Sequence, residues 1–280
     1  MIKGWLSIRE KVNASIDDAF ARVGHFVANF FVEAGRVVLF FLDAGKLIFA
    51  RPYRIEEILK HIEFIGNGSI LIIMLTGAFT GMALSYQIYL GFHLVNATNL
   101  VGPTVALGIS RELGPVLTGL IVSARAGGAM AARLGTMRVS EQIDALDVMG
   151  IDPIQYLVSP RLVGALVSMP LLCGVFDFTA MTGAYILCVK LLGLDEAIFW
   201  DKIQGWLHPR DIYEGLIKSG IFGLIFGSVC THRGFNTTGG AKGVGEATNS
   251  GVVNSMVLII VVNFFATNVI RFYYHMIGIR

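Results

Sequence analysis

The sequence from residue 65 to residue 90 is IGNGSILIIMLTGAFTGMALSYQIYL, and it contains no Asp, Glu, Lys or Arg. About 20 predominantly apolar residues in a helix cross the hydrocarbon core of a bilayer. This stretch is therefore predicted to be a transmembrane helix. Four further stretches have the length and apolar character of a span: Pro103–Ala132, Leu162–Leu192, Ile212–Cys230 and Val252–Phe272. The sequence thus predicts an all-α integral membrane protein with five transmembrane helices.

The composition of the whole chain agrees with lipid as the solvent. Hydrophobic residues make up 54% and charged residues only 15%, and the mean hydropathy is +0.67. A soluble domain has about a quarter charged residues. The net charge is only +2, so no nucleic-acid partner is expected.

The segment before the first span has a different pattern. Apolar residues from Trp5 to Val23 recur at steps of three or four between charged ones, which predicts an amphipathic helix on the membrane surface. Residues 25–50 are more apolar but include Glu33 and Arg36, so an interfacial or a re-entrant segment is expected. We therefore divide the chain into an N-terminal interfacial region, 1–62, and a five-span domain, 63–280.

Lys and Arg are distributed asymmetrically around the predicted spans. They are frequent before the first span, whereas the loop 91–102 has none. Cytoplasmic flanks contain the excess of Lys and Arg. The N-terminus is therefore predicted to be cytoplasmic. Five crossings then place loops 133–161 and 232–250 inside the cell, and loop 193–211 and the C-terminus outside.

Three charged residues within spans are candidates for a substrate pocket. Arg111 and Glu112 lie in the second span close to Pro115, which should interrupt the helical hydrogen bonds and bend the helix. They form either a polar patch near the outward mouth of a pocket or a helix end whose side chains reach headgroups or each other. Asp177 either faces the pocket or hydrogen-bonds with Thr179 or Thr182.

Three arginines lie near the inner end of the second span. Arg125, Arg133 and Arg138 are expected to fix the topology or to bind phosphates of the inner leaflet.

The predicted inside loop contains MRVSEQIDALDVMGIDP at residues 137–153. Ser140 is a favourable N-cap and Gly150 a favourable C′ residue, with Pro153 as a stop, so a short helix Glu141–Met149 is predicted. So short a helix is marginal alone in water and needs a partner surface. That surface is either the inner face of the same chain or a separate cytoplasmic subunit.

The stretch SRELGPVLTGLIVSARAGGAMAARLGTMRVSEQIDALDVMGIDP at 110–153, followed by SPR at 159–161, resembles the MlaE (YrbE) family of ABC-transporter permeases. The resemblance is strongest over Gly77–Pro170. It implies a homodimeric, multi-pass permease of the cell inner membrane that moves phospholipids between the inner and outer membranes and so maintains outer-membrane lipid asymmetry. The short helix would then be the coupling helix, about 140–150, which contacts the ATPase through Glu141, Gln142, Ile143, Asp144, Leu146 and Met149.

The resemblance also implies partners: a cytoplasmic ABC ATPase (MlaF-like), a periplasmic MCE-domain protein (MlaD-like) and a STAS-domain protein (MlaB-like). ATP and Mg would bind the ATPase, and no cofactor is expected in this chain.

The sequence lacks common motifs of an enzyme. The phosphate-binding pattern GxxxxGK[ST] is absent, and Gly239–Gly245 is expected to be a flexible inside connection. No GxSxG or HExxH pattern is present either. We therefore expect no catalytic or metal site in this chain. An ion-gradient-driven secondary transporter is the main alternative, although such proteins often contain paired repeats, and none is evident here.

Overall fold

The computed structural model describes residues 32, 35–37, 39–46 and 54–276. Contacts divide the chain into two compact units, Met1–Asp43 and Ala44–Arg280. The predicted amphipathic helix from Trp5 to Val23 lies outside the described residues. Within 25–50, residues 39–46 are helical.

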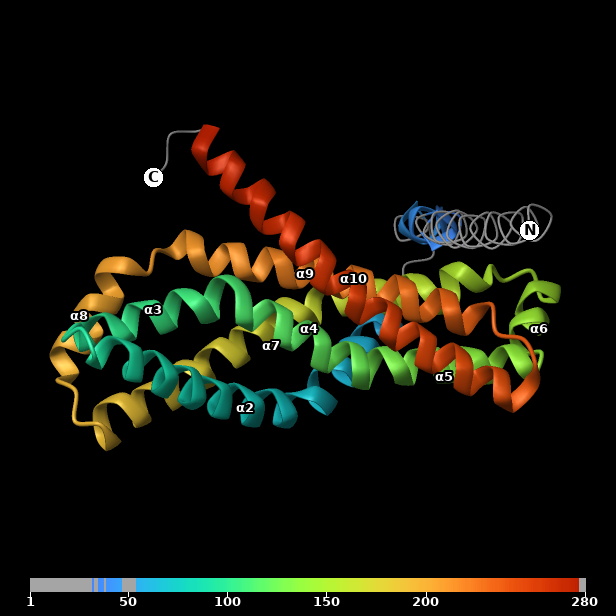
Figure 1. Cartoon of the computed structure of the whole chain (residues 1–280). Helices are drawn as coiled ribbons and strands as arrows, with labels where there is room; N and C mark the ends of the chain where they lie inside the picture. Colours follow the sequence, from blue (N-terminus) through green and yellow to red (C-terminus); the bar gives the residue numbers. More distant parts are fainter. Residues whose placement is uncertain (1–31, 33–34, 38, 47–53, 277–280) are drawn as a thin grey trace, which may run out of the picture. The chain divides into compact units, whose positions relative to one another are not determined.

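Within the part of the chain that the structure describes, five helical rods are long and apolar enough to cross a membrane, which confirms the prediction of five spans (Figure 1). The first is α2 (Ile55–His93), the fourth α9 (Pro209–Phe235) and the fifth α10 (Gly240–Met276). The second rod runs through η1 (Thr98–Leu100), α3 (Val101–Gly108), η2 (Ile109–Leu113), α4 (Gly114–Val122), η3 (Ser123–Gly127) and α5 (Gly128–Val139). The third rod consists of η4 (Ile154–Val158), α7 (Ser159–Tyr185) and η5 (Ile186–Leu191).

The second rod continues past Pro115 because its backbone changes pitch there. The five residues of η2 form a π-helical turn directly before Gly114 and Pro115, and η3 is a second such turn. A π-helical turn accommodates a local break in the usual hydrogen bonding, and such turns are frequent at functional sites.

Two short helices connect the rods at opposite ends of the bundle. The helix α6 (Gln142–Val148) follows α5, and α8 (Glu196–Trp206) lies in the segment 193–211 that was predicted as a loop. Asp195 caps α8 by accepting a hydrogen bond from the Ile198 backbone N–H at 2.9 Å. Phe199 and Ile203 are buried one turn apart. A cap followed by apolar residues at a spacing of four is a sequence signal for this helix.

The expectation of a flexible connection at Gly239–Gly245 is wrong. Only Asn236–Gly239 separate α9 from α10, and the residues from Gly240 onward are helical. Gly239 and Gly240 have φ of +86° and +66°, a conformation that glycine adopts without strain. The two glycines thus complete a tight turn, and the helix starts at once.

Glycines bring α2 and α7 into close backbone contact. A Cβ atom at Gly81 would lie 1.9 Å from the Ala180 carbonyl oxygen, and one at Gly183 would lie 2.2 Å from that of Ala78. Small residues at helix interfaces permit such approach in lipid, where van der Waals packing drives association.

We expect Gly81→Ala to lower the melting temperature of the purified chain by several degrees, because the added methyl group forces two backbones apart at a cost of about 1–3 kcal/mol. Gly91→Ala is the matched control, since Gly91 is also in α2 but nothing lies within 4 Å of a Cβ atom there. Thermal unfolding in detergent measures both. Equal melting temperatures for the two variants would contradict the close packing of α2 and α7.

Candidate functional site

The charged residues of the second span have partners on the fourth span. Arg111 in η2 donates two hydrogen bonds to Asp211 Oδ1, from Nε at 3.1 Å and from Nη2 at 2.7 Å. The other carboxylate oxygen of Asp211 accepts a hydrogen bond from the His208 backbone N–H at 2.8 Å, as part of the capping box of α9. Asp211 is almost fully buried. The same carboxylate therefore begins α9 and ties it to η2.

Lys218 on α9 is fully buried. It lies at the centre of a network of charged side chains that also includes Arg111, Glu112, Asp211 and Glu214. Its Nζ atom is 2.9 Å from Glu214 Oε1 and 3.2 Å from Glu112 Oε1. It also donates to Thr267 Oγ1 on α10 at 2.9 Å. One ammonium group thus joins the second, fourth and fifth spans. A buried charge is tolerated only when it is paired and hydrogen-bonded in this way.

The backbone carbonyl of Arg111, close to Pro115, is a further hydrogen-bond acceptor for this ammonium group. Proline has no N–H to give to the carbonyl four residues before it, which is that of Arg111. Lys218 Nζ donates to that carbonyl oxygen at 3.0 Å. The carbonyl oxygen that Pro115 leaves without a helical donor therefore accepts a hydrogen bond from the buried lysine.

Glu112 is held mainly by the fifth span. Asn263 Nδ2 donates to Glu112 Oε2 and Thr267 Oγ1 donates to Glu112 Oε1, each at 2.9 Å. The side chains of Arg111 and Glu112 both remain about one-third exposed. Their polar atoms can therefore be reached from outside the packed helices, whereas Asp211, Glu214 and Lys218 are enclosed.

Gly215 determines how closely α9 approaches η2. A Cβ atom there would lie 2.1 Å from the Ser110 carbonyl oxygen. The glycine thus permits the contact that places Asp211, Glu214 and Lys218 against the second span.

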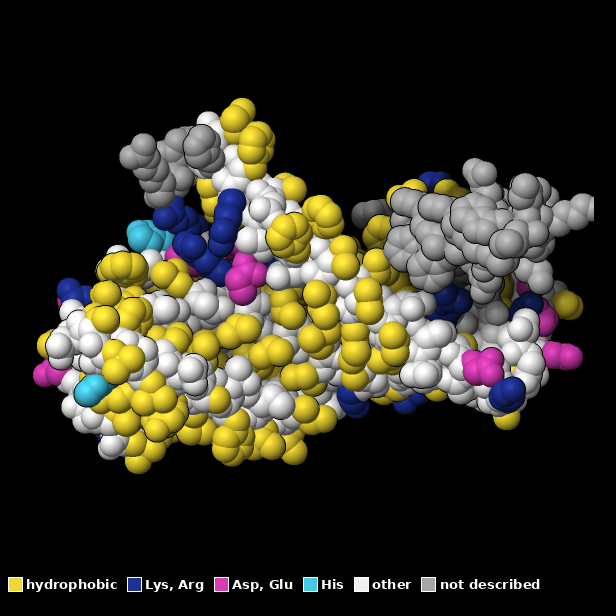
Figure 2. Space-filling model, in the orientation of Figure 1, with side chains coloured by type: hydrophobic (Ala, Val, Ile, Leu, Met, Phe, Trp, Pro, Cys, Tyr) yellow, Lys and Arg dark blue, Asp and Glu magenta, His cyan; other side chains and the backbone are white. Residues whose placement is uncertain are grey.

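The surface around this network is otherwise apolar. Figure 2 shows a group of basic and acidic side chains beside the C-terminal half of α10, while hydrophobic side chains cover most of the middle of the visible face. In Figure 1 that half of α10 leans away from the other spans. Its exposed side chains include Phe264, Phe265, Val269 and Phe272. The charged group therefore lies beside an apolar helix face that lipid or another chain can cover.

Asp177 lies on α7 near the start of α4 and is not part of the network. A Cβ atom at Gly114 would lie 2.0 Å from Asp177 Oδ1. The expected hydrogen bond from Thr179 or Thr182 is wrong, because both hydroxyls donate to carbonyls of their own helix. Asp177 Oδ1 has no hydrogen-bond partner within the described part of the chain.

The short helix predicted at Glu141–Met149 is present as α6, within one residue at each end of the predicted range. Ile143 is buried against Leu134 and Leu157 and so fixes α6 to the bundle, with Leu146 half-buried beside it. Glu141, Gln142, Asp144 and Met149 are exposed. Gly150, with φ of +75°, follows as the predicted C′ residue.

The predicted N-cap role of Ser140 is wrong. Its hydroxyl donates to the Thr136 carbonyl at 2.8 Å and so belongs to the last turn of α5. Glu141 occupies the N-cap position with φ of +60° and makes no capping hydrogen bond with its side chain. The chain reverses within two residues, which leaves no extended residue that could cap α6.

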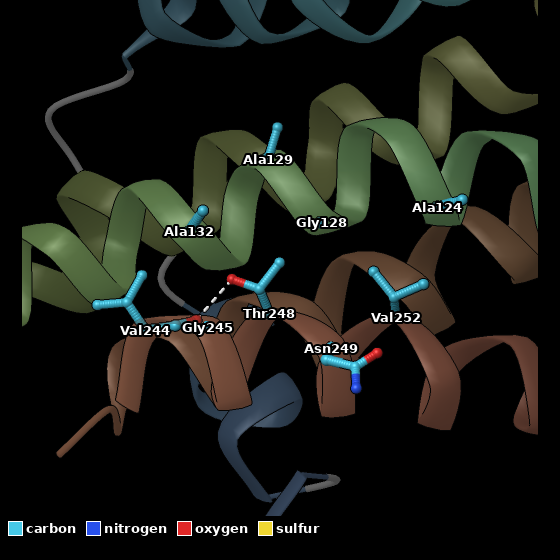
Figure 3. Close-up of a pocket in the computed structure, with 9 residues that line it drawn as sticks. All are labelled: Ala124, Gly128, Ala129, Ala132, Val244, Gly245, Thr248, Asn249 and Val252. Atoms are coloured by element: carbon cyan, nitrogen blue, oxygen red, sulfur yellow. Dashed lines mark hydrogen bonds between the residues drawn. The ribbon is translucent and has the colours of Figure 1, made fainter. Parts of the chain in front are cut away.

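An open groove of about 590 Å³ separates η3 and α5 from α10. Figure 3 shows Thr248 and Val252 of α10 directed toward the rod of η3 and α5, and the hydroxyl of Thr248 bonds back to its own helix. The groove has no charged lining residue, so it differs in chemistry from the ion-pair network.

Comparison with known proteins identifies the family. The sequence model described as Permease MlaE matches residues 58–269. The chain belongs to the MlaE permease family.

Relatives of this chain cover most of its length. A probable ABC transporter permease of Rickettsia conorii is 39% identical over 88% of this chain and 95% of that protein. The intermembrane phospholipid transport system permease protein MlaE of Haemophilus influenzae is 31% identical over 86% of this chain and 97% of its own. The chloroplastic protein TRIGALACTOSYLDIACYLGLYCEROL 1 of Arabidopsis thaliana is 39% identical over 83% of this chain and 65% of that protein.

Membership of the MlaE family makes the chain the permease subunit of an ABC transporter and not its ATPase.

The site that the structure assembles contains five residues that sequence reasoning missed: Asp211, Glu214, Lys218, Asn263 and Thr267. The first three recur at steps of three and four and so share one face of α9, which was the available signal.

We expect Lys218→Met to lower the free energy of unfolding by about 3 kcal/mol or more, since removal of the ammonium group leaves the buried carboxylate of Glu214 unpaired. Lys242→Met is the matched control: Lys242 also pairs with a glutamate one turn away, but its side chain is exposed. Thermal unfolding of the full chain in detergent reports both. Similar small losses in both variants would show that Lys218 does not hold the spans together.

Proposed function

We propose that this chain is the membrane-spanning subunit of an ABC transporter that moves phospholipids between the inner and outer membranes and so maintains outer-membrane lipid asymmetry. The observation that carries the proposal is the match to the MlaE family over residues 58–269. The relative from Haemophilus influenzae is named as a permease of intermembrane phospholipid transport. An ion-gradient-driven secondary transporter is not favoured, since that alternative accounts for none of these matches.

The coupling to ATP hydrolysis is proposed to pass through α6. Ile143 anchors this helix to the bundle, whereas Val148 is 90% and Met149 71% exposed at its end. Exposed apolar side chains beside the acidic Asp147 suit a partly apolar groove on a soluble subunit. Glu141, Gln142, Asp144 and Leu146 form the rest of the proposed contact, and Arg138 steadies Asp144 through an ion pair of 2.5 Å.

The other components follow from the family and are part of the proposal. Two copies of this chain form a homodimer with two MlaF-like ATPases, on which ATP and Mg bind. An MlaD-like MCE protein lies on the periplasmic side, and an MlaB-like STAS protein accompanies the ATPase. The N-terminus and α6 are cytoplasmic and the C-terminus is periplasmic.

Arg111 and Glu112 are proposed to provide the polar part of the lipid pathway. Both are partly exposed in a span, and both are oriented by buried partners on α9 and α10. A phosphate-bearing headgroup can exchange with one member of such a network while the remaining ion pairs persist. Asp177 is kept as a second candidate, because its unpartnered Oδ1 lies close to α4.

Coupling through α6 is tested by Val148→Glu. A carboxylate in an apolar contact should abolish co-purification of the ATPase and ATP-dependent lipid transfer in reconstituted vesicles, because the charge would be buried without a partner. Leu94→Glu is the control, since Leu94 is also an exposed apolar residue but lies beyond the other end of α2. Normal ATPase binding and transfer by Val148→Glu would remove α6 from the coupling interface.

Orientation is tested by single cysteines on exposed residues at the two ends of the bundle. We expect Asn96→Cys to react with a membrane-impermeant maleimide added outside the cell, and Asp147→Cys to react only after the membrane is opened. The native Cys173, Cys188 and Cys230 are buried and provide a low background. Labelling in the opposite order would reverse the proposed topology.

A further inference from the structure

Two arginines of the second span meet one aromatic ring of the first span. Arg125 Nη1 donates to the Phe64 carbonyl oxygen at 2.6 Å, and its Cζ atom lies 4.9 Å from the centroid of the Phe64 ring. The Cζ atom of Arg133 lies 4.3 Å from the same centroid. The two guanidinium groups are therefore neighbours, although each repels the other.

A third arginine, from the third span, adds to this positive charge. Arg161 on α7 is only 7% exposed, and its Nη1 donates to the Leu157 carbonyl oxygen. Its Nε has no hydrogen-bond partner among the described residues. Arg161 interacts electrostatically with Arg133, and His61 on α2 interacts with both arginines.

Nearby carboxylates do not neutralise this cluster. Within residues 54–276, no carboxylate lies at ion-pair distance from Arg125, Arg133 or Arg161. Glu57 is within electrostatic range of Arg161, and it shares Lys60 with Glu56, each at 2.9 Å. One carboxylate therefore offsets part of the charge of three arginines. Cation–π contacts and carbonyl oxygens position the guanidinium groups without cancelling their charge. An anion would therefore be strongly favoured there.

A ligand can reach the cluster from the surface. Arg161 is buried and Arg125 is half-buried, but Arg133 is exposed. Gly68 leaves space for the guanidinium group of Arg125, since a Cβ atom there would lie 1.6 Å from Nη2. Arg125 lies in η3, Arg133 in α5 and Arg161 in the first turn of α7, and α5 leads directly into α6.

We propose that Arg125, Arg133 and Arg161 bind the phosphate group of an anionic phospholipid in the leaflet on the α6 side of the membrane. Arginine binds phosphate through several charge-assisted hydrogen bonds, and basic pockets between spans on the cytoplasmic side bind anionic headgroups. The site is separate from the network around Lys218. Three cations, Arg111, Lys218 and Arg210, the last 3.8 Å from Asp211 Oδ1, balance three carboxylates there: Glu112, Asp211 and Glu214. The proposed phosphate site does not depend on which lipid the transporter moves.

The test is native mass spectrometry of the full chain. The chain in detergent is mixed with equal amounts of dioctanoyl phosphatidylglycerol and dioctanoyl phosphatidylcholine, and the lipids that stay bound after release from the detergent are counted. We expect the wild-type chain to retain the anionic lipid preferentially, and Arg125→Gln and Arg133→Gln each to reduce that preference about fivefold. Gly68→Ala should reduce it as well, because the methyl group displaces the guanidinium group of Arg125 without changing the net charge. Arg138→Gln is the control, since this α5 arginine pairs with Asp144 instead.

Inorganic phosphate added as a competitor identifies the source of the ligand. Loss of the preference at millimolar phosphate would show a site for the free anion, and an unchanged preference would show a site for the lipid headgroup; both outcomes support a phosphate site. Equal retention of the two lipids by the wild-type chain would overturn the proposal. So would a preference that survives in Arg125→Gln, Arg133→Gln and Gly68→Ala alike.

Discussion

The ammonium group of Lys218 imposes a constraint on most of the membrane domain. A charge without water must be matched by opposite charge and by hydrogen-bond acceptors. Glu214 supplies the match from the same helix, Glu112 and the Arg111 carbonyl supply it from the second span, and Thr267 supplies it from the fifth. The relative positions of three spans are therefore linked to the solvation of one atom, and none of them can move far alone.

Charged side chains are balanced at one end of the bundle and are not balanced at the other. Around Lys218, cations and carboxylates are equal in number, and Asp211, Glu214 and Lys218 are enclosed. Around Phe64, the guanidinium groups of Arg125 and Arg133 have an aromatic ring and a carbonyl oxygen as neighbours. The balanced charges around Lys218 favour a fixed structure. The arginines around Phe64 attract mobile anions. Both use arginines of the same continuous helical rod.

The sequence was sufficient for the number of spans and for α6, because long apolar runs and a glycine after a short polar helix are strong local signals. It was insufficient for the partners of Arg111 and Glu112. These partners are 100 residues or more away in the chain, and only packing brings them together. Ser140 failed as an N-cap for a related reason: the α5–α6 reversal is so tight that its hydroxyl stays with the preceding helix. Asp177 lacks its expected threonine donor because hydroxyls within helices bond most easily to their own backbone.

The second span connects these features mechanically. It ends next to α6, passes the arginines that contact Phe64, and reaches the network around Lys218. A displacement of α6 is delivered first to α5, because Ile143 packs on Leu134. A rigid α-helix would transmit that displacement unchanged, but η3 lies between α5 and the network, and η2 itself contains Arg111 and Glu112. Each π-helical turn can absorb a change in register. At η2 the carbonyl of Arg111 is bonded to Lys218, so a change in pitch there alters the ligands of the buried ammonium group.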